Sequence, residues 1–420
     1  MGGNEANPRA VPVSDMRGGV APTDPAGREP SLRARFEGML RPVVDTPINS
    51  HVHRWKASGR PVIGYFCPYV PPELILAAGA LPLRLRAPGS TDSSDADAFL
   101  SGRLCTYVRH VMNAVLGGAF EVLDGVVGTN SCDHVRRAHD LFASKTNVAF
   151  RGFVSVPRNV RESLFPYYLA ELEKLRRGLS DYTGRPVTDD SLREAIVARG
   201  AVRARLLEVQ RAQRDEPPRL SGAESIALHV ASQVMPPADF VALADSLLAE
   251  LDVERVALPP PRARLLLIGA ELDDPHFVQV LESQGALVVG DLLCFGARSL
   301  PLPIDVEGPS PLEAIARATF FRPSCARMIG GFDDRFAAIQ SAMSEARADG
   351  VIFQRLMFCD PSGADVHNLL HRAGSPGAPP LLVLSREYGV VATGQVRTRV
   401  QAFVEKLEIA RARNRAGSAA

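Results

Sequence analysis

The stretch DGVVGTNSCD, residues 124–133, decides the fold, and the stretch DGVIFQRLMFCD, residues 349–360, repeats its pattern. Each begins with Asp-Gly and a β-branched run, which predicts a buried strand. Each then passes through a loop to a cysteine and an aspartate, where a helical pattern begins. In open parallel sheets, ligands bind beyond the carboxyl ends of the strands. We therefore expect Cys132 and Cys359 to lie at such edges.

Strand and helix patterns continue to alternate outward from both stretches. This alternation is typical of parallel sheets covered by helices. The sequence therefore predicts an α/β protein with two Rossmann-like or flavodoxin-like, doubly wound parallel-sheet domains. We expect the two domains to be related by a pseudo-repeat, with a helical insertion between them. The expected strands are 61–66, 80–86, 122–127, 264–269, 286–290, 350–353 and 381–384, and the expected helices include 72–79, 108–120 and 398–411.

Changes in composition predict the domain boundaries. Residues 1–30 are rich in Gly, Pro, Ala and Asp and lack an apolar core, so we expect a disordered leader. A Pro-rich linker ends at Pro261, after a segment of long helical periodicities. The expected units are an N-terminal α/β domain (31–159), a helical region with its linker (160–261), a C-terminal α/β domain (262–410) and a tail (411–420).

Bulk composition narrows the classes of function. The 420 residues carry a formal net charge of +1, with 46% apolar and 23% charged residues, as in ordinary globular proteins. No basic run predicts a nucleic-acid partner, and no run approaches the roughly 18–20 apolar residues that cross a membrane. Without a secretory signal pattern, we expect a cytoplasmic protein whose six cysteines do not form structural disulfides.

The six cysteines divide three and three between the two α/β regions. We expect three corresponding positions in each half: one after a strand, one before a helix and one after the repeated Asp-Gly stretch. In that order the expected pairs are Cys67 and Cys294, Cys105 and Cys325, and Cys132 and Cys359.

These thiols have two interpretations. Iron–sulfur clusters require thiolate ligands, and helix amino termini favour thiolates and stabilise anions. Four of the six cysteines lie at or just before an expected helix start, and we expect the nearby Arg109, Arg136 and Arg327 to add positive potential. The alternative is that each thiol is an inert core residue, since no CxxC pair is present.

Three blocks of sequence resemble the 2-hydroxyacyl-CoA dehydratase and benzoyl-CoA reductase family. The first is GYFCPYVPPELILAAGALP (residues 64–82), and the second runs from Leu123 to Asp133. The third joins Phe358-Cys359-Asp360 to GQVRTR (394–399) and Ala402-Phe403. The similarity covers roughly residues 35–410, and the three blocks together are specific.

The resemblance implies an enzyme subunit that holds a [4Fe-4S] cluster through Cys105, Cys132 and Cys359. Such an enzyme transfers low-potential electrons to a CoA thioester through a ketyl radical. A separate ATP-dependent iron–sulfur activator supplies the electron, and a homologous second subunit completes the enzyme. This sequence has no Walker A pattern, so any ATP hydrolysis belongs to the partner.

Two further interpretations stay open. The double-cubane branch of the same family uses more thiolates, and Cys67, Cys294 and Cys325 would then add to an [8Fe-9S] cluster. The resemblance to that branch implies a homodimeric reductase of small molecules that works with a similar activator. A third hypothesis, from a different class, is a non-catalytic α/β binding module whose cysteines only pack.

Other candidates have modest support. Glu73, at an expected helix start, is a weak candidate for proton transfer, although a first-turn acid that compensates the helix dipole explains it as well. We expect His51 and His53 to form an exposed loop pair rather than a metal site. The turn at 268–271 lacks GxGxxG spacing, so nucleotide binding there is disfavoured. We expect Asp133 and Asp360 to cap helices.

Overall fold

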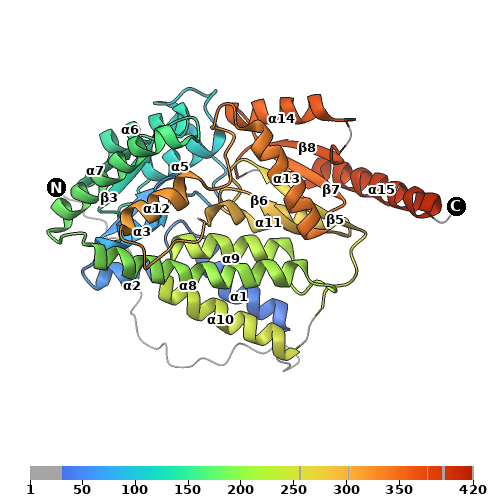
Figure 1. Cartoon of the computed structure of the whole chain (residues 1–420), viewed down its shortest axis with the longest axis horizontal. Helices are drawn as coiled ribbons and strands as arrows, with labels where there is room; N and C mark the ends of the chain where they lie inside the picture. Colours follow the sequence, from blue (N-terminus) through green and yellow to red (C-terminus); the bar gives the residue numbers. More distant parts are fainter. Residues whose placement is uncertain (1–30, 255–256, 301, 376, 390–392, 419–420) are drawn as a thin grey trace, which may run out of the picture.

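The computed structural model describes residues 31–254, 257–300, 302–375, 377–389 and 393–418 (Figure 1). The expected leader, 1–30, lies outside the described residues. The expected tail does not begin at Arg411, because the last helix continues to Ser418.

The N-terminal lobe is built on a four-stranded parallel sheet in the order β2-β1-β3-β4. Three of its short strands are buried along their whole length, as expected for a parallel sheet covered on both faces, whereas the edge strand 150–154 alternates buried and exposed residues. The strands are β1 (Val62–Tyr65), β2 (Leu81–Arg84), β3 (Gly125–Thr129) and β4 (Phe150–Val154), and the helices are α3 (Pro72–Ala77), α4 (Ser94–Asp97), α5 (Thr106–Leu116) and α6 (Asp133–Lys145).

The C-terminal lobe repeats this topology, with a parallel sheet in the order β6-β5-β7-β8. In both sheets the first strand of the lobe lies between the second and the third, which confirms the predicted pseudo-repeat. The elements are β5 (Ala263–Gly269), α11 (Pro275–Glu282), β6 (Ala286–Leu292), the 3-10 turn η2 (Ala297–Ser299), α12 (Pro311–Phe320), α13 (Phe332–Ala346), β7 (Gly350–Leu356), α14 (Asp360–Arg372), β8 (Leu381–Arg386) and α15 (Thr393–Ser418).

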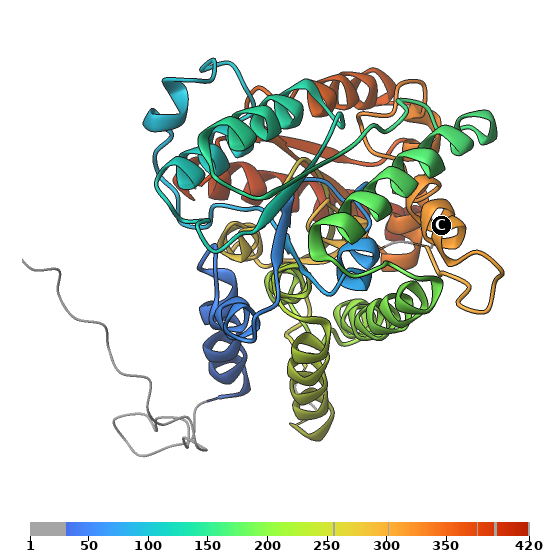
Figure 2. The same cartoon turned by 90° about the vertical axis from the view of Figure 1, so that its left-hand side faces the viewer.

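A layer of helices lies on one side of both sheets (Figures 1 and 2). The segment between the lobes is helical, as predicted, but α1 and α2 precede the first strand and were not expected. α1 packs against α9 and α10. The helices are α1 (Leu32–Val44), α2 (Ser50–Ala57), α7 (Phe165–Thr183), preceded by the 3-10 turn η1 (Glu162–Leu164), α8 (Asp189–Arg214), α9 (Gly222–Val234) and α10 (Pro237–Glu254).

Helix α9 joins the two lobes through one core. Of its 13 residues, 12 are buried, so it is apolar on nearly every side, as expected of a core helix. It contacts β2 of one sheet and β6 of the other. A Cβ at Gly222 would collide with Val288, so glycine permits the close approach to β6. One apolar cluster contains residues of both lobes. The domain boundaries expected at residues 159 and 261 stay a prediction.

Candidate metal centre

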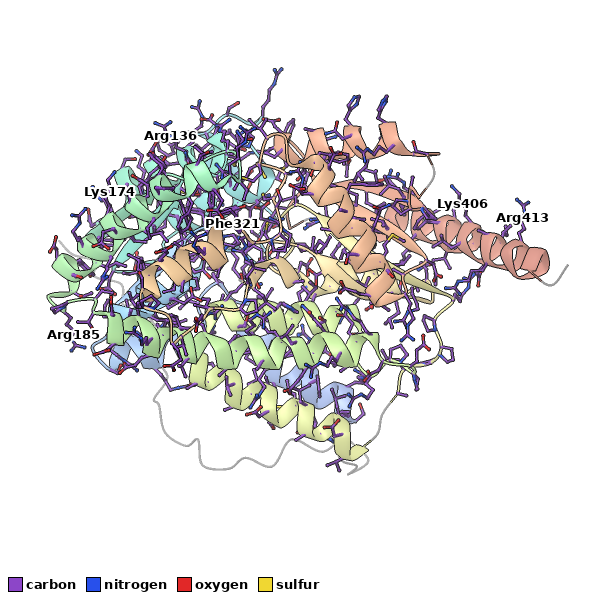
Figure 3. All side chains as sticks on the ribbon, in the orientation of Figure 1. Arg136, Lys174, Arg185, Phe321, Lys406 and Arg413 are labelled. Atoms are coloured by element: carbon purple, nitrogen blue, oxygen red, sulfur yellow. The ribbon has the colours of Figure 1, made fainter. Side chains whose placement is uncertain are left out.

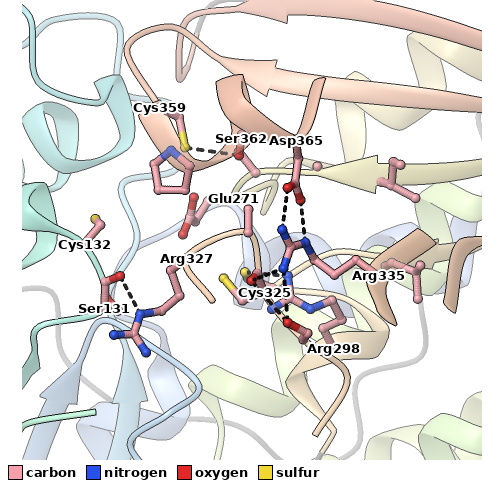
Figure 4. A pocket seen from close by; sticks show the side chains of 18 of the residues that line it. Ser131, Cys132, Glu271, Arg298, Cys325, Arg327, Arg335, Cys359, Ser362 and Asp365 are labelled. Atoms are coloured by element: carbon pink, nitrogen blue, oxygen red, sulfur yellow. Dashed lines mark hydrogen bonds and ion pairs between the residues drawn. The ribbon is translucent and has the colours of Figure 1, made fainter. Parts of the chain in front are cut away.

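All six cysteines line one cavity between the lobes. The cavity measures about 1250 Å³, including space open to solvent. Figure 4 shows Cys132, Cys325 and Cys359 around it, with Glu271 in the middle. None of the six forms a disulfide. The structure therefore brings together thiols that are far apart in sequence, as expected from their places at sheet edges.

Local geometry explains three of these positions. Cys105, Cys132 and Cys359 are the N-cap residues of α5, α6 and α14. Cys132 Sγ accepts a hydrogen bond from the Val135 amide at 3.4 Å. Free N–H groups at a helix start favour negative charge, and at Cys132 the Val135 amide partly offsets the effect of burial on the pKa of the thiol.

The thiols form contacts that cross the seam between the lobes. A hydrogen bond from the Cys105 thiol to Cys359, together with burial, raises the pKa of Cys105 well above its ordinary value. The Cys105 amide also donates to His134 Nδ1 at 3.1 Å. Cys132 interacts with Cys359 as well, although burial is the main cause that raises the pKa of Cys132. We call Cys105, Cys132 and Cys359 the first thiol group.

The other three cysteines lie along a second part of the cavity wall. Cys294 donates a hydrogen bond to Cys325, which lowers the pKa of Cys325 well below its ordinary value. Arg298 Nη1 lies 3.6 Å from Cys294 Sγ and adds to this effect. Cys67 follows β1 and faces the same cavity. We call Cys67, Cys294 and Cys325 the second thiol group.

Arginines without acidic partners surround the second thiol group. Arg84 is 1% exposed, and none of its three guanidinium nitrogens has a hydrogen-bond partner. Its guanidinium lies 4.4 Å above the ring of Phe295, beside Cys294. Within the described residues, no carboxylate forms an ion pair with Arg84, Arg298 or Arg322. Burying a cation that has no acidic partner is costly, so these arginines favour a negative charge near them. Arg298 and Arg322 line the thiol cavity, and Arg84 lines the neighbouring cavity.

Two further arginines hold the cysteine loops in place. Arg327 donates hydrogen bonds to main-chain carbonyls of the N-terminal lobe, including Ser131 O at 2.7 Å, and so ties the Cys325 loop to the Cys132 loop (Figure 4). Arg335 forms a two-pronged ion pair with Asp365 and donates to Cys325 O at 3.2 Å. The loops are thus braced by long-range bonds rather than by local structure.

Several expectations about charged residues were wrong. Arg109 is directed away from the thiols, to Asp97 and Ser93. Arg136 is exposed on the outer side of α6 (Figure 3). Asp133 and Asp360 are first-turn residues, because the preceding cysteines take the N-cap positions.

His51 and His53 lie in α2 rather than in a loop, since Asn49 caps that helix. His51 Nδ1 lies 2.6 Å from Asp239. Glu73 is buried in α3 but lines a neighbouring cavity, not the one that contains the thiols.

The expected correspondence of cysteines is correct only in part. Cys132 and Cys359 follow the equivalent strands β3 and β7. Cys67, however, follows the first strand of its lobe, and Cys294 follows the second, so they do not correspond. Glu271, two residues after β5, takes the place in the repeat that Cys67 takes after β1. Cys325 lies in the loop between α12 and α13, not directly before a helix.

Sequence reasoning missed most of the polar lining of the cavity. Glu271 had a signal, since it follows a strand at the binding edge of the second sheet, and burial raises its pKa. Arg322 and Arg335 had none, because Pro68 and Asp365, to which they bond, are distant in sequence. Arg298 follows Cys294 by four residues, but its sequence position alone does not show that its side chain faces the thiol. The missed lining residues are His134, Glu271, Arg298, Arg322, Arg335 and Asp365.

Fold and site define a class: a two-lobed parallel α/β protein whose thiols converge on a cavity at the seam. Residues 67–407 match the family described as 2-hydroxyglutaryl-CoA dehydratase, D-component. The chain belongs to this family of enzymes. A non-catalytic binding module is therefore not supported.

Curated relatives agree with this assignment. The chain is 28% identical to one of the subunits of benzoyl-CoA reductase from Thauera aromatica, over 74% of this chain and 82% of the relative. It is 24% identical to the (R)-phenyllactyl-CoA dehydratase beta subunit of Clostridium sporogenes, over 89% of this chain and 99% of the relative. It is 23% identical to the beta subunit of (R)-2-hydroxyglutaryl-CoA dehydratase from Acidaminococcus fermentans, over 84% of this chain and 94% of the relative.

Among the helices of the described residues, none combines the length and apolar character that crossing a membrane requires.

Proposed function

We propose that this chain is the iron–sulfur component of a dehydratase-family enzyme that delivers low-potential electrons, and that all six thiols hold a double-cubane [8Fe-9S] cluster. The observation that carries the proposal is that both thiol groups line the same cavity, with unpaired guanidinium groups beside the second. Inert core cysteines would not require buried cations beside them. A cluster with its thiolates is an anion, and it offsets the cost of burying these arginines.

The residues present fit such a group. Within the described part of the chain, no three His, Cys, Asp or Glu side chains converge on a single-ion site. Thiolates around an iron–sulfur cluster bind different irons, so they surround a space rather than one point. Six thiols around a wide cavity have this arrangement.

The second candidate is a [4Fe-4S] cluster held by Cys105, Cys132 and Cys359 alone. The names of the relatives favour it, because they are subunits of enzymes that act on CoA thioesters. On this proposal an acyl-CoA substrate, converted through a ketyl radical, enters the cavity. When bound, either cluster supplies single electrons of low potential.

The chain's own residues then orient and protect the centre. Arg327 and Arg335 hold the cysteine loops, and Arg84 and Arg298 stabilise negative charge. We also propose a cytoplasmic location, an ATP-dependent iron–sulfur activator as electron donor, and a homologous second subunit or a homodimer. The beta-subunit names of the relatives support a partner subunit.

Iron and sulfide analysis after anaerobic purification tests the proposal. We expect about eight irons per chain for the double cubane and about four for the single cubane. Cys132→Ser should lower the iron content in both cases. Cys325→Ser separates them, since it lowers the content only if the second thiol group binds iron. Ser131→Ala, on the same cavity wall, is the control that keeps every thiol. Parent protein without iron would refute both candidates.

A further inference from the structure

A row of cavities leads from the thiol cavity to the surface beside α8. The next cavity, about 310 Å³, shares Pro68 and Arg322 with the thiol cavity. A third, about 560 Å³, shares Glu73 and Arg199 with the second. Its remaining wall includes exposed Val197 and Gly200 on α8 and residues 302–306. The three cavities thus follow one another from the seam to the solvent.

Polar atoms in the middle cavity lack protein partners. Glu73 is 1% exposed, and its Oε1 accepts no hydrogen bond. Its nearest charged atom is Arg199 Nε at 4.0 Å, a distance that one water molecule can bridge. Arg84, Gln233 and Ser299 also present unpartnered polar atoms along this cavity. Buried polar groups are almost always hydrogen-bonded, so this lining is suited to bind an ordered water molecule.

Among the described residues that line the second and third cavities, Glu73 has the only carboxyl group. Arginine does not release its proton in proteins, so the arginines of this path cannot relay protons. The polar groups that face Glu73 are Arg199 from α8, Arg84 from β2, Tyr65 from β1, Tyr168 from α7 and Arg322 after α12. Burial raises the pKa of Glu73, and Arg199 and Arg322 only partly oppose it.

We propose that Glu73 relays protons from the surface at α8 to the thiol cavity, along these three cavities. The inference rests on the proposed electron-transfer function. Each electron that a one-electron donor adds to the buried centre brings one negative charge, which one proton neutralises. The O–H bond of Glu73 breaks as a new O–H bond forms to a water molecule, which carries the proton past Arg322 into the thiol cavity. The Glu73 carboxylate then regains a proton from solvent through the outer cavity.

Substitutions at two places on the route test the proposal. Glu73→Gln keeps the shape but cannot exchange a proton, while Glu73→Asp retains an acid. Gly200 lines the outer cavity, and a Cβ there would meet no atom within 4 Å, so Gly200→Phe is chosen to place a ring in that cavity. Gly200→Ala is the matched control that leaves it open. Glu194→Gln removes an exposed carboxylate from the same helix, away from the route.

The assay is the rate at which titanium(III) citrate reduces the iron-loaded protein, in H₂O and D₂O and across pH. We expect Glu73→Gln and Gly200→Phe to slow reduction about tenfold or more and Glu73→Asp to restore part of the rate, with both controls at the parent rate. The parent rate should fall as pH rises through the pKa of Glu73. An infrared band of a protonated carboxyl group that shifts in D₂O should disappear in Glu73→Gln.

The outcomes separate this proposal from the proposed function. Iron-replete variants that are reduced at the parent rate, with an unchanged pH profile, would refute the route and leave the cluster assignment intact. Loss of iron in Glu73→Gln would show a structural role and overturn the relay. Parent protein without iron would instead refute the proposed function.

Discussion

Arg327 offers the strongest test of how the lobes are joined. Its side chain is 6% exposed and donates to the carbonyls of four residues across the seam, at 2.7–3.3 Å: Asn130, Ser131, Val156 and Pro157. Hydrogen bonds from a charged donor contribute about 1.5–3 kcal/mol each, but they are not additive. Arg327→Met also removes a buried charge, which offsets part of the loss. We therefore expect a decrease of about 4 kcal/mol in the free energy of unfolding, near the upper limit for one substitution.

Urea unfolding, followed by circular dichroism, measures this decrease, and hydrogen exchange locates it. Exchange should accelerate at residues 128–137 and 154–158, where the carbonyl acceptors lie. Arg136→Met is the control, because that exposed arginine should change stability by less than about 0.5 kcal/mol. A decrease under about 1 kcal/mol for Arg327→Met, or faster exchange spread evenly over both lobes, would refute the reasoning.

Three more substitutions test features beside the site. Gly269→Ala should lower the free energy of unfolding by several kcal/mol, because φ at this position is +130° and a Cβ would collide with the backbone of β7. Gly38→Ala in α1 should instead raise the free energy of unfolding by about 0.5–1 kcal/mol, as measured by thermal unfolding. Burial raises the pKa of Glu282 to about 7 from its ordinary 4.5, so the folded state binds a proton that the unfolded state releases. The stability of the protein should therefore fall as pH rises between these two values, and Glu282→Gln should flatten that part of the stability–pH curve. Asp365→Asn, which leaves Arg335 without its counter-ion, should cost about 3–5 kcal/mol in urea unfolding and accelerate hydrogen exchange in the Cys325 loop.

Each of these three predictions has a clear contrary result. Equal stability of the two glycine variants would remove the backbone argument at Gly269. A parent stability that is constant between pH 4.5 and 7 would contradict a raised pKa for Glu282. Unchanged exchange around Cys325 in Asp365→Asn would show that the ion pair does not brace that loop.

The sequence predicted the sheets well because local pattern controls them. Apolar runs that alternate with helical periodicities gave all strands of the two sheets except β4, which lies at an edge of its sheet. The repeat of Asp-Gly stretches then placed Cys132 and Cys359 at the strand ends. Both signals are short-range, so one sequence is enough to show them.

The polar surroundings of the thiols could not be predicted in the same way. Arg84 lies in a short strand whose pattern shows only burial, and nothing nearby indicates that its guanidinium approaches the second thiol group. Arg327 was expected to add charge, but its bonds to carbonyls more than 150 residues away show that it braces the seam. Strand order also matters: only the topology shows that Cys67 and Glu271 are equivalent positions.

The first thiol group draws Cys105 and Cys132 from one lobe and Cys359 from the other. If these thiols hold the proposed cluster, its assembly and the docking of the lobes form a single linked equilibrium, in which the affinity for the cluster adds to the affinity of one lobe for the other. A chain cleaved between the lobes would then reassociate more tightly in the presence of iron and sulfide than in their absence. The cofactor would serve as an internal crosslink as well as a site of chemistry.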